Sequence, residues 1–132
     1  MATLEKTVVP GNMDEIPGLA DLGLIKAILT KNPLVGLPLY IVRDAGTIVA
    51  AAAVDPDGYP LYAKLWCIEV AETHRRKGIG SLIIRRILED YDDLKLVAVR
   101  AAFGFYRRIG FAFLPGREPD PRSNVGYMVS LV

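Results

Sequence analysis

The sequence predicts a mixed α+β domain, and three observations lead to this fold class. Apolar runs rich in β-branched and aromatic residues are separated by scattered glycines and prolines. Leu39 to Asp44 and Thr47 to Val54 flank Ala45-Gly46, which is typical of an antiparallel hairpin. Leu61 to Val70 and Leu94 to Val99 then enclose a segment of helical period, which predicts a parallel crossover. We therefore expect a central, mostly antiparallel sheet with about four helices on its faces.

The N-terminal part predicts one strand and two short helices. Ala2 to Val9 contains the β-branched run of the strand. Asn12 and Glu15 resemble a capping pair, and Pro17 limits the helix that follows to a turn or two. Asp21 to Leu29 places its apolar residues on one helical face, which predicts the second helix.

The remaining elements follow from glycine and proline punctuation and from the apolar period. They are a turn at Asp55 to Gly58, a helix from Ile79 to Asp90, a short helix from Ala101 to Ile109, a strand from Phe111 to Leu114, a surface loop from Pro115 to Asn124, and a final strand from Val125 to Val132.

Composition narrows the class of protein. The 132 residues fit a single domain, residues 1–132, with a real hydrophobic core. Sixteen basic residues balance fifteen acidic ones, so no general field draws the chain to nucleic acid or to an anionic membrane. Cys67 and His74 are the single cysteine and histidine, which predicts no disulfide and no metal site. The first residues lack a secretory pattern, and Ile48 to Val54 is too short to span a membrane. We expect a soluble, cytoplasmic protein.

The segment Arg75 to Ser81 reads Arg-Arg-Lys-Gly-Ile-Gly-Ser and lies where a strand ends and a helix begins. Unpaired backbone N–H groups, the helix dipole and three cations all favour a bound phosphate there. It is neither a dinucleotide-binding fingerprint, because Ile83 occupies the place of the third glycine, nor a P-loop. An ordinary basic turn is the alternative interpretation.

Two motifs resemble a known family. The segment Ile68 to Gly80 reads Ile-x-Val and then Arg-x-x-Gly-x-Gly, and this resembles the signature of the GNAT superfamily of acyl-coenzyme A-dependent N-acetyltransferases. The segment Ala102 to Phe111 is similar to the later motif of the family, a helix with a tyrosine followed by an apolar-Gly-Phe turn. The resemblance covers roughly residues 39 to 114.

This resemblance implies a splayed sheet, in which the strand ending near Val70 parts from the one beginning near Leu94. The pantetheine arm of acetyl-coenzyme A (acetyl-CoA), the implied cofactor, would lie in the gap. Backbone groups of Cys67, Ile68 and Val70 would bind the arm. The pyrophosphate would meet the residues of the loop, which are Arg75, Arg76, Lys77, Gly78, Ile79, Gly80 and Ser81.

The implied activity is transfer of an acetyl group from acetyl-CoA to a primary amine, by direct attack and through a tetrahedral intermediate. Tyr106 matches the tyrosine of the family that acts as general acid, and a phenol holds a transferable proton at neutral pH. A half-buried core aromatic is the alternative interpretation of Tyr106. Small amines, protein N-termini, lysines and aminoacyl-RNA remain open as acceptors.

No general base stands out in the sequence. Glu69 lies on the strand that borders the gap, but alternation along the strand turns it away if Ile68 and Val70 face the cofactor. Glu72 and His74 suit solvated positions near the loop, and a water relay is a further alternative. We expect Cys67 to be a buried thiol rather than a nucleophile.

Three further positions leave alternatives open. Many relatives place an asparagine after the strand that follows the helix, whereas this chain has Arg100 there. Arg100 either replaces the asparagine by binding a phosphate or an acidic group, or the contact is missing. Trp66 and Tyr62 either line the acceptor side or fill the core.

Rival functions are an acyl-CoA sensor that lacks activity, a degenerate family member, and a nucleic-acid binder. The last would use His74 to Lys77 with Arg85 and Arg86, but the near-neutral charge argues against it. The apolar final strand suits either pairing across a homodimer or an internal place in the sheet.

Overall fold

The structure is a computed structural model that describes residues 2–19, 22–31, 34–59 and 62–130. Seven strands form one sheet in the order β1-β2-β3-β4-β5-β7-β6. The strands are β1 (Ala2–Val8), β2 (Pro38–Asp44), β3 (Thr47–Tyr59), β4 (Tyr62–Val70), β5 (Leu94–Val99), β6 (Phe111–Phe113) and β7 (Val125–Ser130). The α-helices are α1 (Gly23–Lys31), α2 (Ile79–Asp90) and α3 (Phe103–Arg108), and short 3-10 turns are η1 (Met13–Glu15), η3 (Glu72–His74) and η4 (Arg100–Ala102).

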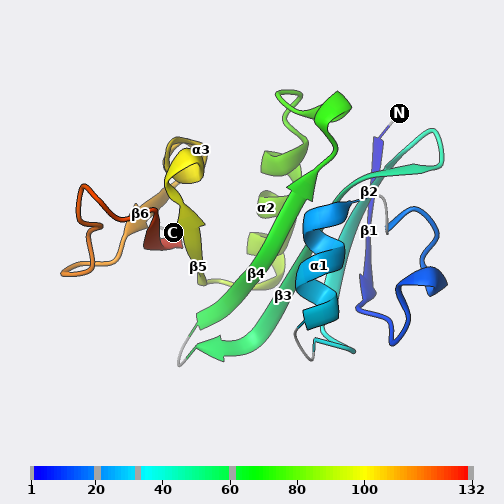
Figure 1. Cartoon of the computed structure of the whole chain (residues 1–132), viewed down its shortest axis with the longest axis horizontal. Helices are drawn as coiled ribbons and strands as arrows, with labels where there is room; N and C mark the ends of the chain where they lie inside the picture. The colour runs from blue at the N-terminus through cyan, green and yellow to red at the C-terminus, as the bar shows by residue number, and fades with distance from the viewer. Residues whose placement is uncertain (1, 20–21, 32–33, 60–61, 131–132) are drawn as a thin grey trace.

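Helices cover the two faces of this sheet unequally. Helix α1 lies on one face, which we call the α1 face, and helices α2 and α3 lie on the other, the α2 face (Figure 1). The core of the α1 face joins Ile25 and Leu29 of α1 to strand residues such as Ile41. The core of the α2 face joins Ile83 of α2 and Phe103 of α3 to buried residues of most strands. Burial of these apolar faces is the main stabilising contribution to the fold.

The mixed α+β sheet confirms the predicted fold class. β4 and β5 are the parallel pair, connected by α2, and the other pairs are antiparallel. The described residues contain three α-helices rather than about four, because the capped segment after Asn12 closes only a 3-10 turn. The side chain of Asn12 does cap that turn, since it accepts a hydrogen bond from the N–H of Asp14 at 3.0 Å. No α-helix in the described ranges has the length and apolar character to cross a membrane.

One other prediction is wrong, and one open alternative is decided. The turn predicted at Asp55 to Gly58 is part of β3, which continues to Tyr59 with an irregular register. Pro56 has no N–H for the ladder, and the carboxylate of Asp55 accepts a hydrogen bond from the N–H of Asp57 at 2.9 Å, so the segment bulges instead of reversing. Of the two alternatives for the final strand, the structure has the internal one: β7 lies between β5 and β6, so its described residues have no free edge. Leu131 and Val132 of the predicted final strand lie outside the described residues.

Candidate functional site

A gap opens in the middle of the sheet between β4 and β5. Their parallel pairing covers Ala63 with Leu94, Lys64 with Lys95, and Leu65 with Leu96, and then stops. The two strands diverge beyond this point, toward the N-terminus of α2 (Figure 1). The pairing of β3 with β4 skips Trp66 at the same level, because Ala53 opposes Cys67 while Val54 opposes Leu65. Trp66 is thus the extra residue of a β-bulge, and bulges bend a strand and increase its twist. We attribute the divergence of β4 to this bulge.

The edge of β4 beyond the bulge presents backbone groups to the gap. The N–H of Ala71 donates to the carbonyl of Val49 at 2.7 Å, and this bond shows which residues of β4 direct their backbone groups toward β3. Alternation then turns the backbone groups of Glu69 and Cys67 toward β3, and those of Ile68 and Val70 toward the gap. Among the three predicted pantetheine contacts, Ile68 and Val70 therefore face the gap and the backbone of Cys67 does not.

The loop before α2 has a backbone suited to an anion. Arg76 has a φ of 64° and Gly78 a φ of 80°, and both values lie in the left-handed region. In the described part of the chain, the backbone N–H groups from Arg76 to Ser81 have no hydrogen-bond acceptor, and the helical ladder begins with the N–H of Leu82. A left-handed arginine is uncommon and costs about 1–3 kcal/mol, so the loop holds a strained conformation.

The three cations of the loop have different roles. The guanidinium of Arg75 donates through Nε to the carbonyl of Val70 at 3.0 Å, so Arg75 ties the loop to β4. Arg76 and Lys77 are exposed and form no ion pair with the described residues. These two side chains are therefore available to a phosphate, while the side chain of Arg75 satisfies the last carbonyl of the strand.

Gly80 serves the packing of two helices. A Cβ atom at this position would lie 3.0 Å from the ring of Phe105, which is closer than nearly all real Cβ contacts. Gly80 therefore lets α3 approach the N-terminus of α2. The resemblance implied that Gly80 meets the pyrophosphate, whereas the space where its side chain would lie is occupied by Phe105.

Tyr106 is held in an aromatic cluster of α3. Its ring packs edge-on against Phe105 at 5.1 Å and against Phe111 at 5.6 Å between centroids, and the residue is 7% exposed. Burial, and to a smaller extent the nearby Cys67, raises the pKa of Tyr106 to about 12. Among the described residues, Trp66 Nε1 is the only fully buried side-chain N or O atom without a hydrogen-bond partner. The Tyr106 hydroxyl is not such an atom, so it is not sealed in the core.

Cys67 is a buried free thiol in the core of the α1 face. Burial raises the pKa of Cys67 to about 11, partly offset by a hydrogen bond with the backbone of Ala53. A protonated thiol is a weak nucleophile, so its environment agrees with the expected core role.

Two of the three candidate bases, Glu69 and His74, are engaged in structural contacts. The Oε1 of Glu69 accepts a hydrogen bond from the N–H of Ile25 at 3.0 Å, near the start of α1. His74 lies between Thr73, at 2.8 Å from Nδ1, and Asp44, at 2.9 Å from Nε2. Glu72 is exposed. Glu69 thus anchors a helix, and His74 joins the loop region to the β2–β3 turn.

Arg100 is hydrogen-bonded to the backbone of the loop between β6 and β7. Its Nε donates to the carbonyl of Ser123 and its Nη2 to the carbonyl of Asp120, both at 2.9 Å. The guanidinium therefore fixes the loop between β6 and β7. Trp66 and Tyr62 are half-buried, and each lies near a lysine: Lys64 Nζ is 3.5 Å from the ring centroid of Trp66, and Lys95 Nζ is 5.6 Å from that of Tyr62.

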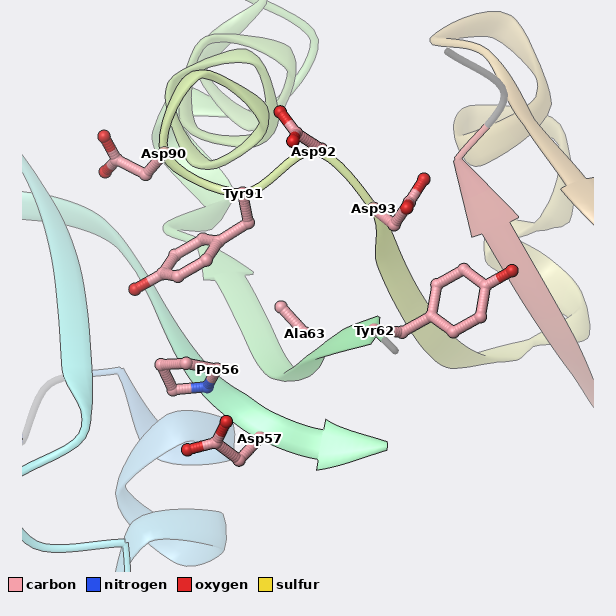
Figure 2. A pocket seen from close by; sticks show the side chains of 8 residues that line it. All are labelled: Pro56, Asp57, Tyr62, Ala63, Asp90, Tyr91, Asp92 and Asp93. Atoms are coloured by element: carbon pink, nitrogen blue, oxygen red, sulfur yellow. The ribbon is translucent and has the colours of Figure 1, made fainter. Parts of the chain in front are cut away.

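Two hollows of about 400 Å³ lie away from the gap. One lies at the closed end of β4 and β5, where Asp57, Asp92 and Asp93 surround it together with Tyr62 and Tyr91 (Figure 2). Its carboxylates repel phosphate, so it is not a pyrophosphate site. Within the described ranges, no three His, Cys, Asp or Glu side chains are placed to hold a metal ion.

Sequence reasoning missed two features of this site. The bulge at Trp66 was not predicted, because Leu61 to Val70 looks like one continuous strand. The left-handed conformation of Arg76 was also not foreseen. Of the two left-handed residues of the loop, Arg76 and Gly78, only Gly78 is of the residue type that usually adopts this conformation. The break in apolar alternation at Trp66 and Cys67 was the one available sign of the bulge.

Comparisons with known proteins agree with this geometry. The family described as acetyltransferase (GNAT) domain matches residues 36–112, more than half of the chain. Comparison with curated protein sequences gave no significant match.

Solved structures share the whole fold at low identity. Escherichia coli ElaA has a TM-score of 0.73 at 16% identity, over 99% of this chain and 100% of that one. The ribosomal-protein-S18-alanine N-acetyltransferase of Escherichia coli has a TM-score of 0.68 at 15% identity, over 100% and 96%. A GNAT family acetyltransferase from Elizabethkingia anophelis with acetyl-CoA bound has a TM-score of 0.68 at 17% identity, over 99% and 98%. The chain therefore belongs to the GNAT family, and its chemistry is acyl transfer.

Proposed function

We propose that this protein transfers an acetyl group from acetyl-CoA to a primary amine. The observation that carries the proposal is the end of β4–β5 pairing at Leu65 and Leu96, beside a loop whose backbone N–H groups are open. A gap in a sheet and an anion-binding helix start suit a long, flexible arm that ends in a pyrophosphate. The bound acetyl-CoA of the Elizabethkingia anophelis protein, which has the same fold, supports this choice of cofactor.

The residues of this chain fit the two parts of the cofactor. The N–H groups from Arg76 to Ser81 would bind the pyrophosphate, with Arg76 and Lys77 adding positive charge. The N–H and carbonyl of Ile68 and the N–H of Val70 would pair with the amides of the pantetheine arm, much as a neighbouring strand would. The carbonyl of Val70 is already bonded to Arg75, so it is left out of this set.

Tyr106 would supply a proton to the departing sulfur. In the reaction the amine nitrogen forms a bond to the thioester carbonyl carbon, the C–S bond breaks, and the sulfur takes the proton of Tyr106. The nitrogen gives up a proton to solvent, and Tyr106 regains one from solvent. The N–H of Ile68 or Val70 would stabilise the oxyanion. A pKa of about 12 keeps the Tyr106 phenol protonated far above neutral pH. We therefore expect no loss of turnover near pH 10, where an ordinary tyrosine ionises.

Thiol release with a panel of primary amines tests the proposal, with wild-type protein and Tyr106→Phe compared from pH 7 to pH 10. We expect turnover of the variant to fall by about 100-fold while its affinity for acetyl-CoA, measured by calorimetry, stays the same. Tyr91→Phe is the matched control, because Tyr91 borders the acidic hollow instead of the gap. Equal turnover of wild type and Tyr106→Phe would remove the acid role. Acetyl-CoA binding without thiol release for any amine would favour the sensor.

A further inference from the structure

Strand β5 also presents backbone groups to the gap, on the side opposite β4. The N–H of Arg100 donates to the carbonyl of Asn124 at 2.7 Å, just beyond the last pair of β5 with β7. In an antiparallel ladder this bond means that Arg100 and Ala98 direct their backbone groups toward β7. Alternation then turns the backbone groups of Val97 and Val99 the other way, toward β4 and the gap.

The parallel ladder stops before all of these groups are paired. Its last pair, Leu65 with Leu96, engages the N–H of Val97. The next two groups on this edge are the carbonyl of Val97 and the N–H of Val99, and neither has a hydrogen-bond partner in the described chain. One acceptor and one donor of β5 therefore lie open at the closed end of the gap.

The bulge at Trp66 explains why they are open. In a regular parallel ladder the next residue of β4 to face β5 after Leu65 would be Cys67. Its N–H would donate to the carbonyl of Val97, and its carbonyl would accept from the N–H of Val99. The extra residue turns the backbone of Cys67 toward β3 instead. The bulge thus vacates the place of one amino-acid residue beside β5.

This vacant place lies near the expected thioester, an inference that rests on the proposed function. A pyrophosphate at the loop and a pantetheine arm along Ile68 and Val70 bring the thioester toward the closed end of the gap. Val97 and Val99 follow the last paired residue of β5, so they lie at that end on the opposite strand. The two edges can therefore hold different partners, the thioester on β4 and the acceptor on β5.

The vacant place is open toward the α1 face. Ala98 points into the core of the α2 face, so the side chains of Val97 and Val99 point to the α1 face. They are 45% and 58% exposed there, and the described core of the α1 face contains no residue of β5 or β7. On the α2 face, α2 and α3 meet where Phe105 contacts Gly80. An acceptor therefore approaches over two exposed valines.

We propose that the carbonyl of Val97 positions the attacking amine and that the N–H of Val99 binds a carbonyl of the acceptor. A primary amine that donates one N–H to Val97 keeps its lone pair for the thioester carbon. The two β5 groups are spaced for one residue of a parallel strand, so the amine and the carbonyl of the acceptor are attached to the same carbon atom. The acceptor is thus an α-amino amide, as in an amino-acid amide or the N-terminal residue of a peptide.

The basicity of this class of amine agrees with the apolar approach. An apolar surface favours the uncharged amine, which is also the form that attacks a thioester. An α-amino group has an ordinary pKa of about 8, whereas that of a lysine side chain is about 10. An α-amino group is therefore uncharged in a much larger fraction of molecules at neutral pH.

The test uses two isomeric products, N-acetyl-alaninamide and N-acetyl-β-alaninamide, with the protein first saturated with coenzyme A. The isomers have the same atoms and no charge, and the second carbonyl of the β isomer is one carbon farther from the acetylated nitrogen. Binding is followed by NMR of the ligand. We expect the α isomer to bind about tenfold more tightly, because it alone spans the two β5 groups.

A proline variant removes the donor of β5. Val99 has a φ of −77° and a ψ of 151°, so Val99→Pro suits the backbone and deletes an N–H that is not used in the sheet. We expect it to abolish the preference for the α isomer. Val99→Ala is the matched control, because it also changes the side chain but keeps the N–H, so it should keep the preference. Circular dichroism checks that both variants are folded.

The outcomes separate the two levels of the proposal. Failure of the wild-type protein to bind coenzyme A in the first step would overturn the proposed function, and this inference with it. Coenzyme A binding with equal affinity for the two isomers, or a preference that survives Val99→Pro, would overturn the acceptor class and leave acyl transfer intact. The isomer comparison needs the wild-type protein alone, so it decides the question even if the proline variant does not fold.

A longer product distinguishes the two sources of an α-amino amide. N-acetyl-alanyl-alaninamide adds one residue beyond the group that spans Val97 and Val99. Tighter binding than that of N-acetyl-alaninamide supports a peptide as the acceptor, and equal binding supports a small amino-acid amide. Loss of binding would overturn the open approach over the α1 face.

Discussion

The two halves of the sheet are built differently. β1 to β4 are paired along most of their lengths, and helices α1 and α2 cover the two faces of β2, β3 and β4. β5, β7 and β6 have helical cover on the α2 face alone, within the described chain. Only three residue pairs join β4 to β5, whereas β5 and β7 share five.

This difference shows how the site is made. The strands β1 to β4 form one continuously paired half of the sheet, and β4 diverges from the C-terminal half beyond the bulge at Trp66. Helices α2 and α3 bridge the halves on one face, and so they hold the gap open instead of letting the strands close. The end of strand pairing leaves backbone groups of β4 without strand partners, and these are the groups that we propose bind the pantetheine arm.

The largest effect is expected at the mouth of the gap. Gly78→Val places a β-branched residue at a φ of 80°, so the loop must change conformation and its N–H groups are displaced. We expect acetyl-CoA affinity, measured by calorimetry, to fall by about 100-fold or more. Gly116→Val is the matched control, since Gly116 has a φ of 77° in the loop between β6 and β7. An equal loss of affinity in the control would point to general unfolding.

The next effect addresses the bulge itself. Deletion of Trp66 leaves Leu65, Cys67 and Ile68 in regular alternation between the two faces, so β4 can continue its pairing with β5. We expect a folded protein by circular dichroism that no longer binds acetyl-CoA. Trp66→Ala removes the ring and keeps the extra residue, so it should still bind. Binding by the deletion variant would show that the bulge is not what opens the sheet.

A smaller effect concerns the N-terminal half of the sheet. The hydroxyl of Tyr40 on β2 donates to the carboxylate of Asp90 at the end of α2 at 2.6 Å. This bond, with a further one from Arg86, lowers the pKa of Asp90 to about 2. A lowered carboxyl pKa contributes stability above its ordinary value near 4, and that contribution is lost as the pH falls toward 2.

Tyr40→Phe should therefore lower the free energy of unfolding by about 1 kcal/mol at neutral pH, and the difference from wild type should close between pH 4 and pH 2. Urea unfolding at several pH values measures it. A difference that is constant with pH would mean that loss of packing, rather than of the bond to Asp90, is responsible.

The smallest effect is expected at Glu69. Glu69→Gln keeps an oxygen that accepts from the N–H of Ile25, so both stability and turnover should stay close to wild type. Glu69→Ala should cost about 1 kcal/mol of stability through the lost cap of α1, with turnover largely kept. Thermal unfolding and thiol release measure the two quantities. A large fall in turnover for Glu69→Gln would instead make Glu69 the general base.

Most of the fold could be predicted from local patterns. The hairpin at Ala45-Gly46 and the change from strand to helical period near Ile79 follow from residue types that act over a few positions. The prediction of a turn at Asp55 to Gly58 was wrong, because the same residue types also form a bulge within a long strand. Only the tertiary pairing with β4 decides between the two.

The site was less accessible to such reasoning. The loop could be recognised, because its cations and glycines are contiguous. The engagement of Arg75 with Val70, of Glu69 with α1 and of Arg100 with the loop after β6 depends on contacts between distant segments. The pairing of Lys64 with Lys95 likewise depends on the register of β4 with β5.

Backbone amide NMR with acetyl-CoA tests the central claim most directly. We expect the largest shifts at the N–H groups of Arg76 to Ser81 and of Ile68 and Val70, while pantetheine without its pyrophosphate should move the two β4 residues alone. Shifts confined to the acidic hollow at Asp92 and Asp93, with the loop unchanged, would contradict the assignment of the gap and the loop as the acetyl-CoA site.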